Sequence, residues 1–539
     1  MNDKFYITTP IYYANGAPHL GHAYTTIAAD VLARFHRREG KNVFLSTGMD
    51  EHGLKIQESA EKTGKDPQEF VDEIAENFQD LFNKLNIQYD GFIRTTSPEH
   101  IKAVQKALQI LYGKGAIKKG KYKGLYCVGC EQFITSSQLV DGKCPDHDME
   151  PQELEEDSYL LDLKSVKKDL IEAIEKADQP VTPENDGKLL KINPLKKRNE
   201  ILSFLKNQDL QDVAISRDKK NVSWGIELPF DKSQITYVWV DAFLNYLTAL
   251  GWDGTSENVP DLFPPQIQLM GKDILRVHAT IWPAMLLHLG IKLPKEIFAH
   301  GMILSGGKKM SKTLGNVISI DEMFDKFGTD ATRYLLMSAG TFGGDVDITM
   351  ERMAEKYNAD LVNGIGNTVA RVTKMSENIK FPSGNPATLT APADIREEVL
   401  KYCLVAVRTG HYEENDFKCD IRFLVNWGEK LLRIDKDFCG SIDFIIRIQR
   451  LIDKLITELK PWTLEGDVRV TVLHNFLEGI RQMAYMLQPF MSETSEKIFG
   501  KLGLDAKEEL AKTFDEATKW GSVEFKNVQK GEGLFPRIK

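Results

Sequence analysis

The stretch KFYITTPIYYANGAPHLGH, residues Lys4–His22, joins a β-rich segment to the beginning of a helix. Its aromatic and β-branched residues predict a strand at Lys4–Thr8, and Pro10–Pro18 is typical of a loop. A helix pattern follows at His19–Arg38, and Val43–Thr47 is predicted to be the next strand. A strand, a loop, a helix and a further strand in this order predict a parallel α/β sheet.

The α/β pattern is interrupted near Ile117, where the chain becomes lysine-rich and carries cysteines. We interpret residues 117–227 as an insertion, because the α/β pattern returns after them. Strands are then predicted at Ile235–Val240 and Gln266–Met270, and helices at Asp241–Leu250 and Ile274–Leu289.

The chain is helical in character after about residue 350. Between Ile448 and Leu459 the apolar residues recur at intervals of three and four, which predicts a helix with one buried face. This helix is expected to end before Pro461, because proline lacks the amide hydrogen that a helix interior needs.

The composition is that of an ordinary globular protein. The 539 residues are 42% hydrophobic and 27% charged, with a formal net charge of −9, which excludes a simple polybasic nucleic-acid binder. No apolar run approaches the ~20 residues of a membrane helix, and Met1–Asn15 lacks the pattern of a secretory signal. Six cysteines do not form a disulfide framework in a chain of this length, so we expect a reducing cytoplasm.

The sequence PHLGH, Pro18–His22, lies where the first strand gives way to a helix. Helix N-termini expose unpaired amide hydrogens and attract phosphate. His19 and His22 are three residues apart on the first turn and can donate hydrogen bonds to phosphate oxygens, while Gly21 lets a flat base approach the backbone. The alternative is a plain pair of surface histidines.

A second polar segment, SGGKKMSKT, occupies residues 305–313. Two glycines permit movement, and Lys309 and Lys312 supply point charges suited to a polyphosphate. Such a segment can also be a solvated loop. Because 287 positions separate Lys309 from His22, only the fold could bring them together.

Four further residues have the spacing of metal ligands. Cys127, Cys130, Cys144 and His147 form the pattern C-x2-C-x13-C-x2-H inside the insertion. Three thiolates and one imidazole suit a tetrahedral zinc ion, and four protein ligands leave no position for water. The pattern therefore predicts one structural zinc per chain.

The pair PHLGH and KMSKT, in this order, resembles the two signatures of class I aminoacyl-tRNA synthetases, with Leu20 and Thr313 as conservative departures. Four further stretches resemble the methionyl-tRNA synthetase family: TPIYYANG from Thr9, TGMDEHG from Thr47, YVWVDA from Tyr237 and GKDILRVH from Gly271. The resemblance implies a Rossmann-like α/β catalytic domain with an inserted zinc-knuckle domain, followed by an all-α anticodon-binding helical bundle. The implied divisions are catalytic halves 1–116 and 228–292, insertion 117–227, stem-contact region 293–350, anticodon-binding domain 351–515 and tail 516–539.

The same resemblance implies the roles of individual residues. Asp50 would hold the substrate ammonium, Arg217 would lie near the site, and Gly271 and Asp273 would contact the ATP ribose. His19, Gly21, His22, Lys309 and Lys312 would bind ATP, with the two histidines and two lysines catalytic. The methionine pocket would be lined by Ile11, Tyr13, Trp239, Ala242, Tyr246, Ile274, His278 and Trp282. A thioether is soft and weakly polar, which suits an aromatic-walled pocket.

The implied reaction has two steps: ATP activates L-methionine to methionyl-adenylate, and the methionyl group is then transferred to the 3′-terminal ribose of tRNA(Met), for initiation and elongation of translation. The methionine carboxylate is already ionised at pH 7, so attack on the α-phosphate needs no general base. We expect Mg²⁺ to accompany ATP.

RNA recognition is expected in the helical part. Asn367 and Arg371 are four residues apart, on the face opposite the apolar stripe of Ile365, and Trp462 follows Pro461 at a helix end. These match the family's anticodon-reading residues. Where many relatives have Asn about eight residues before the proline, this chain has Asp453, whose charge would repel phosphate.

Three alternatives remain at this stage. Another class I synthetase, cysteinyl above all, shares zinc and size; a silent tRNA-binding paralogue would lack the reaction; and a small-molecule nucleotidyltransferase would not need the helical domain. The chain has no lysine-rich module after that domain, which in this family often accompanies dimers, so we expect a cytoplasmic monomer without membrane attachment.

Overall fold

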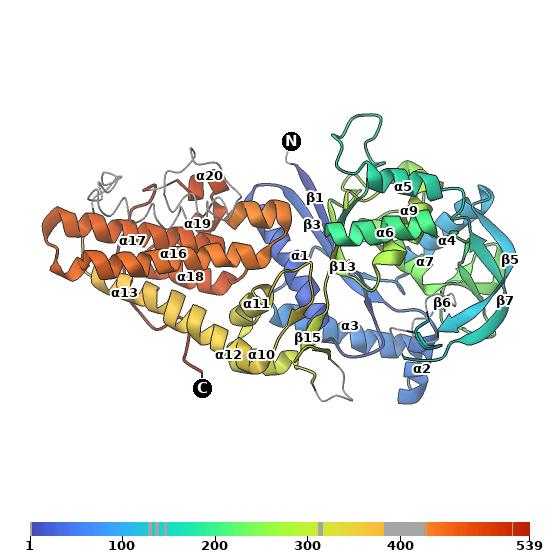
Figure 1. Cartoon of the computed structure of the whole chain (residues 1–539), viewed down its shortest axis with the longest axis horizontal. Coiled ribbons are helices and arrows are strands. Elements are labelled where there is room, and N and C mark those ends of the chain that lie inside the picture. The colour runs from blue at the N-terminus through green and yellow to red at the C-terminus, as the bar shows by residue number, and fades with distance from the viewer. Residues whose placement is uncertain are drawn as a thin grey trace. The chain divides into compact units, whose positions relative to one another are not determined.

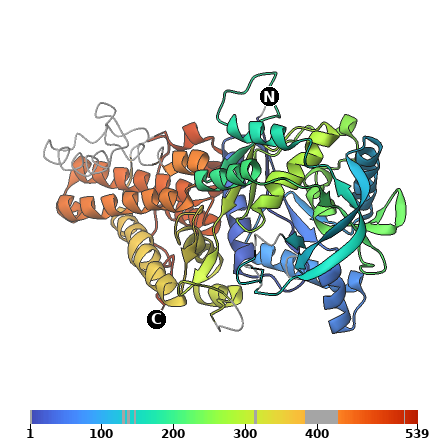
Figure 2. The ribbon, with the colours of Figure 1, turned by 45° about the vertical axis from the view of Figure 1, so that its right-hand side comes forward.

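The computed structural model describes residues 3–127, 132–134, 139–144, 148–310, 316–381, 425, 428–519 and 521–538. The chain forms two compact units. We call residues 4–29 and 42–300 the α/β unit, and residues 1–3, 30–41 and 301–539 the helical unit. Figures 1 and 2 show their elements from two directions.

A parallel sheet forms the centre of the α/β unit. Its strand order is β2-β3-β1-β13-β14-β8, and β4 pairs with β3. Every pairing in it is parallel, which confirms the predicted parallel α/β sheet. The strands are β1 Lys4–Thr8, β2 Tyr12–Tyr13, β3 Asn42–Asp50, β4 Gly91–Arg94, β8 Lys191–Asn193, β13 Ile267–Gly271 and β14 Glu296–His300.

Helices connect these strands, as parallel pairing requires. Helix α3 begins with an N-cap and a proline: the Asp66 side chain accepts a hydrogen bond from the Gln68 backbone N–H, and Pro67 is the first helical residue. The helices are α1 Leu20–Arg38, of which Leu20–Ala29 belongs to this unit, α2 Leu54–Thr63, α3 Pro67–Lys84, α4 Pro98–Gly113, α5 Lys167–Glu175, α6 Leu195–Asn207, α7 Val238–Phe243, α8 Asn245–Thr248 and α9 Leu275–Leu289.

The prediction for residues 235–250 is wrong in its details. Strand β12 (Asp231–Thr236) ends early, and Val238–Phe243 is already helical. The predicted single helix is divided at Leu244 into α7 and α8. A short, mostly apolar run has no periodicity that would separate a buried strand from a buried helix.

Two smaller sheets lie within or beside the predicted insertion. Strands β6 (Gln132–Ile134), β5 (Ile117–Cys127), β7 (Gln152–Leu161) and β9 (Val213–Ala214) form an antiparallel sheet in that order. Strand β12 pairs between β10 (Ser216–Asp218) and β11 (Glu227–Leu228). The same stretch of chain supplies β8 to the parallel sheet.

The helical unit contains a small three-stranded sheet and a set of packed helices. The predicted amphipathic helix is α16, which ends at Leu459, and Pro461 begins the next turn. The elements are β15 Ile303–Ser305, β16 Lys308–Lys309, α10 Ile320–Phe327, α11 Thr329–Met337, β17 Val346–Asp347, α12 Met350–Lys356, the π-helix η3 Tyr357–Gly366, α13 Asn367–Ser376, the π-helix η4 Leu431–Asp435, α16 Phe438–Leu459, the 3₁₀ turn η5 Pro461–Thr463, α17 Gly466–Leu487, α18 Ser492–Lys501, α19 Ala506–Ala511 and α20 Phe514–Ala517.

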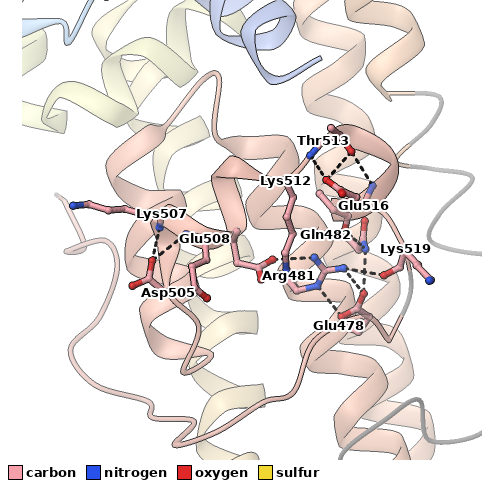
Figure 3. Close-up of polar contacts among 12 residues, drawn as sticks. Glu478, Arg481, Gln482, Asp505, Lys507, Glu508, Lys512, Thr513, Glu516 and Lys519 are labelled. Atoms are coloured by element: carbon pink, nitrogen blue, oxygen red, sulfur yellow. Dashed lines mark hydrogen bonds and ion pairs between the residues drawn. The ribbon is translucent and has the colours of Figure 1, made fainter. Parts of the chain in front are cut away.

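A buried charge network joins α17 to α19 (Figure 3). The Arg481 guanidinium is fully buried and pairs with Glu478 at 2.6 Å and with Glu509 at 3.1 Å. It also donates to the Lys519 carbonyl oxygen. Because a buried charge is costly without partners, this network fixes the arrangement of these helices.

Residues of the predicted tail lie against the same unit. The Tyr357 hydroxyl donates to the Pro536 carbonyl at 3.0 Å, and the Asn358 side-chain amide donates to the Ile538 carbonyl at 3.0 Å. The Lys530 N–H donates to Glu377 at 3.0 Å. The end of the chain therefore docks on η3 and the end of α13.

Within the described part of the chain, no helix combines the length and apolarity needed to cross a membrane.

Candidate active site

Two histidines stand at the beginning of α1, where the strand order of the sheet reverses. Strand β1 has β3 on one side and β13 on the other, and ligands of open α/β sheets bind beyond the carboxyl ends of strands at such a point. The His19 and His22 rings are stacked there, with centroids 3.6 Å apart and planes inclined by 19°. Since the helix N-terminus also attracts anions, the place suits a phosphate.

The backbone sets the tautomer of both histidines. The Gly21 N–H donates to His19 Nδ1 at 3.1 Å, and the His19 N–H donates to His22 Nδ1 at 3.2 Å. A neutral imidazole that accepts at Nδ1 carries its proton on Nε2, so each ring presents an Nε2–H donor. Burial and the neighbouring His19 hold the pKa of His22 well below its usual value. At pH 7 His22 therefore offers a neutral hydrogen-bond donor.

A Cβ atom would be crowded by neighbouring side chains at Gly21 and at Gly271. A Cβ atom on Gly21 would lie 3.0 Å from His19 Cε1, and one on Gly271 would lie 2.5 Å from Asp273 Oδ1. Gly271 ends β13, and the following Lys272 N–H donates to the His300 carbonyl at the end of β14. The predicted ribose contacts, Gly271 and Asp273, thus lie at the carboxyl end of β13, the strand that neighbours β1 at the switch point.

Three residues predicted for the methionine pocket form one buried cluster. His278 Nδ1–H donates to the Ile274 carbonyl at 2.9 Å, so Nε2 accepts a hydrogen bond from the Tyr246 hydroxyl at 2.9 Å. Burial lowers the pKa of His278 to about 4. The Tyr246 ring lies 5.6 Å from that of Trp282, whose indole N–H donates to Gln268 at 3.2 Å.

Trp239 differs from Trp282 in its environment. Trp282 is fully buried and hydrogen-bonded, whereas Trp239 is half-buried on α7 beside the buried Ala242. The Trp239 indole nitrogen is buried yet has no hydrogen-bond partner among the described residues. A buried donor of this kind is compatible with the wall of a ligand pocket.

The polar end of the predicted pocket lies at the ends of β2 and β3. Tyr13 is the register partner of Asp50, and the Ala14 N–H donates to the Asp50 carbonyl at 2.9 Å. The Asp50 side chain is buried, while Ile11 and Tyr13 are half-buried. The two strands therefore place the predicted ammonium ligand beside a pocket aromatic.

A buried acid–imidazole pair near these residues was not predicted. His52 Nδ1 lies 2.8 Å from Asp241 Oδ2, and both residues are buried. Burial raises the pKa of the Asp241 carboxyl, although the hydrogen bond from His52 opposes this rise. The pair joins the chain after Asp50 to helix α7. His52 lies in the TGMDEHG stretch and Asp241 in the YVWVDA stretch, but nothing in the sequence indicates that these two stretches are in contact.

A small cleft lies beside the segment that follows His52. Arg217 lines it and lies with its guanidinium carbon 5.4 Å from the Tyr237 ring centre. The other lining residues are Gly53, Leu54, Val222, Ile235, Thr236 and Val238. Arg217 thus lies beside the segments that carry His52 and Trp239, in keeping with its predicted place near the site.

The lysine signature belongs to the helical unit. Strands β15 and β16 form a hairpin whose turn residues, Gly306 and Gly307, have φ of +62° and +73°. Two positive φ values are typical of a tight two-residue hairpin turn, so the glycines predicted as a hinge close a turn. Lys309 is exposed on β16, and Lys312 lies outside the described residues. Convergence of this segment with His19 and His22 stays a prediction.

The predicted zinc ligands are described in part. Cys127 ends β5, and Cys144 follows a small turn closed by the Val140–Lys143 bridge; both are buried. Cys130 and His147 lie outside the described residues. Among the residues that the structure describes, no three His, Cys, Asp or Glu side chains form a metal-binding group.

The predicted RNA-reading residues are accessible. Asn367 is exposed on α13, and the Arg371 side chain retains 38% of its surface. Trp462 is 57% exposed in η5, which excludes a role as a core anchor.

Comparison with known proteins places this geometry in a family. A family model described as class I tRNA synthetases (M) matches residues 5–373. The methionine–tRNA ligase of Caldanaerobacter subterraneus is 37% identical over 100% of this chain and 79% of its own length, and that of Streptomyces coelicolor is 38% identical over 99% and 96%. The structure of Mycobacterium tuberculosis methionyl-tRNA synthetase with methionyl-adenylate matches with a TM-score of 0.85 and 30% identity, covering 100% of both chains. The chain therefore belongs to the methionyl class I tRNA synthetases.

Proposed function

We propose that this chain is a methionine–tRNA ligase, which activates L-methionine with ATP and charges tRNA(Met) for initiation and elongation. The observation that carries the proposal is similarity over the entire chain to methionine–tRNA ligases and to a solved methionyl-adenylate complex. These relatives favour methionine over cysteine as the amino-acid substrate.

ATP–pyrophosphate exchange with each of the twenty amino acids offered alone tests the assignment. Methionine alone should support rapid exchange. Preference for cysteine would establish the cysteinyl alternative, and absence of exchange with every amino acid would establish a silent paralogue.

The proposed first step is attack of the methionine carboxylate on the α-phosphate of ATP, which releases pyrophosphate. The Nε2–H groups of His19 and His22 would donate to phosphate oxygens, and Lys309 and Lys312 would neutralise phosphate charge. Mg²⁺ bound to ATP would reduce the repulsion between the phosphates and the carboxylate. Positioning and charge neutralisation suffice, because no proton must leave the attacking carboxylate.

Two parts of the predicted pocket would hold the methionine: a carboxylate for its ammonium group and an aromatic cluster for its side chain. Asp50 would pair with its ammonium. The aromatic cluster around Tyr246 and Trp282, with Ile11, Tyr13, Trp239, Ala242, Ile274 and His278, would surround the thioether. In the second step a hydroxyl of the terminal tRNA ribose would attack the adenylate carbonyl and release AMP.

We further propose one structural zinc at Cys127, Cys130, Cys144 and His147. Support comes from the ligand spacing and from the burial of Cys127 and Cys144, since buried thiols at turns suit a closed zinc site. Zinc bound there would hold the inserted region in shape.

The helical unit is proposed to read the anticodon through Asn367, Arg371 and Trp462. Their exposure supports this, because unpaired bases stack on aromatic rings and bond to amide and guanidinium groups. The predicted domain boundaries, monomeric state and cytoplasmic location remain proposals of the same kind.

A further inference from the structure

Asp453, whose charge is expected to oppose phosphate, has both of its carboxylate oxygens engaged in hydrogen bonds. Oδ1 accepts a hydrogen bond from Arg371 Nη1 at 2.9 Å. Oδ2 accepts from the Thr368 hydroxyl at 2.8 Å and from the Gln449 side-chain amide at 2.5 Å. The carboxylate is thus fixed from two helices.

The hydrogen bond to Asp453 orients the Arg371 side chain and leaves its other N–H donors available. Thr368 and Arg371 lie on α13, and Gln449 and Asp453 lie on α16, which packs beside it (Figure 1). A guanidinium has five N–H donors, and the bond to Asp453 uses one of them. The Arg371 side chain remains 38% exposed, so its other donors are within reach of a ligand.

The neighbourhood suits an unpaired nucleotide. Asp453 lies six residues before the last residue of α16, about 9 Å along the helix axis. The exposed Trp462 stands three residues after that helix end. An exposed indole for stacking and an oriented guanidinium for hydrogen bonding are the two elements of single-stranded RNA recognition.

We propose that Asp453 is a positioning residue for tRNA recognition, which holds the Arg371 guanidinium in the orientation that contacts RNA. This inference rests on the proposed anticodon role of Arg371. The ion pair also reduces the expected repulsion between Asp453 and phosphate, because the charge of Asp453 is balanced by that of Arg371.

Two assays on the full chain separate this role from others. The variants are Asp453→Ala, Asp453→Asn and Arg371→Gln, and the readouts are KM for tRNA(Met) in aminoacylation and ATP–pyrophosphate exchange without tRNA. Asp453→Ala should raise KM for tRNA(Met) about tenfold while leaving exchange unchanged, as expected for one misplaced charged hydrogen bond. Asp453→Asn keeps an acceptor for Arg371 and should stay within about threefold of the parent.

The outcomes that overturn the inference are distinct. Suppose that Arg371→Gln raises KM for tRNA(Met), whereas Asp453→Ala leaves this KM unchanged or lowers it. The positioning role of Asp453 is then wrong, and the proposed anticodon role of Arg371 stands. If Arg371→Gln leaves KM unchanged, the proposed role of Arg371 fails first. If Asp453→Asn and Asp453→Ala raise KM for tRNA(Met) equally and both lower the unfolding temperature, the cause is a packing defect and the positioning role is wrong. Glu493→Gln, which removes an exposed carboxylate from α18, is the charge control and should change neither readout.

Discussion

Replacement of His52 by leucine tests whether the buried pair with Asp241 supports the methionine site. The substitution leaves the Asp241 carboxylate fully buried without its partner at 2.8 Å. Leaving a buried polar group without its hydrogen-bond partner costs about 1–3 kcal/mol. For a unit of this size each kcal/mol lowers Tm by roughly 2–4 °C, so we expect a loss of about 2–12 °C.

The pair should also affect the substrate selectively. His52 follows Asp50 by two residues, and Asp241 precedes Ala242 on α7, so both partners adjoin predicted methionine contacts. In His52→Leu we expect KM for methionine in ATP–pyrophosphate exchange to rise about tenfold or more, with KM for ATP within about twofold, because a misplaced contact weakens only the ligand that it touches.

A double-mutant cycle decides whether the pair acts as a unit. His52→Leu with Asp241→Leu removes both polar partners and should be more stable than either single variant, because no buried polar group is left without its hydrogen-bond partner. Lys106→Ala, which breaks an exposed pair with Asp253, is the control and should cost only about 0–1 kcal/mol. Strictly additive losses in the double variant would refute the coupling on which this reasoning depends.

Three further outcomes are expected. Lys312→Ala should slow ATP–pyrophosphate exchange by about 10²–10³-fold with little change in methionine binding measured by calorimetry, since it removes charge neutralisation from the phosphates; a near-normal rate would contradict the assigned role. Metal analysis of the purified chain should find one zinc, lost in Cys127→Ser together with a lower Tm, because a missing thiolate opens the closed site; zinc-free protein of unchanged Tm would argue against the site. Burial lowers the pKa of His278 from 6.5 to about 4, so the unfolded chain takes up a proton that the folded chain does not. Stability is therefore complete above pH 6.5 and falls by up to about 3 kcal/mol as the pH drops toward 4, and His278→Gln should show a shallower decline of Tm over that range.

Local chemistry made much of the fold predictable. The start of α3 follows from Asp66 and Pro67, and the end of α16 follows from Pro461, because caps and missing amide hydrogens act within a few residues. The parallel sheet was predictable for a similar reason, since alternating strands and helices leave few other arrangements.

What could not be predicted depends on residues that are distant in sequence. His52 and Asp241 are 189 positions apart, and neither motif contains a sign of the other. The division of α7 from α8 and the pairing of β8 with β14 likewise depend on tertiary packing, which overrides weak local preferences.

The expected effect of Asp453 on RNA binding depends on its hydrogen-bond partners. Considered alone, an acidic side chain near an RNA-binding surface opposes phosphate through its charge. With Arg371 at 2.9 Å, the Asp453 charge is paired, and the carboxylate can orient the guanidinium. An asparagine at this position could accept the same hydrogen bond but would orient the arginine less firmly, because a neutral acceptor binds a guanidinium more weakly than a carboxylate does. Aspartate at position 453 is therefore expected to give a more rigid donor than asparagine would.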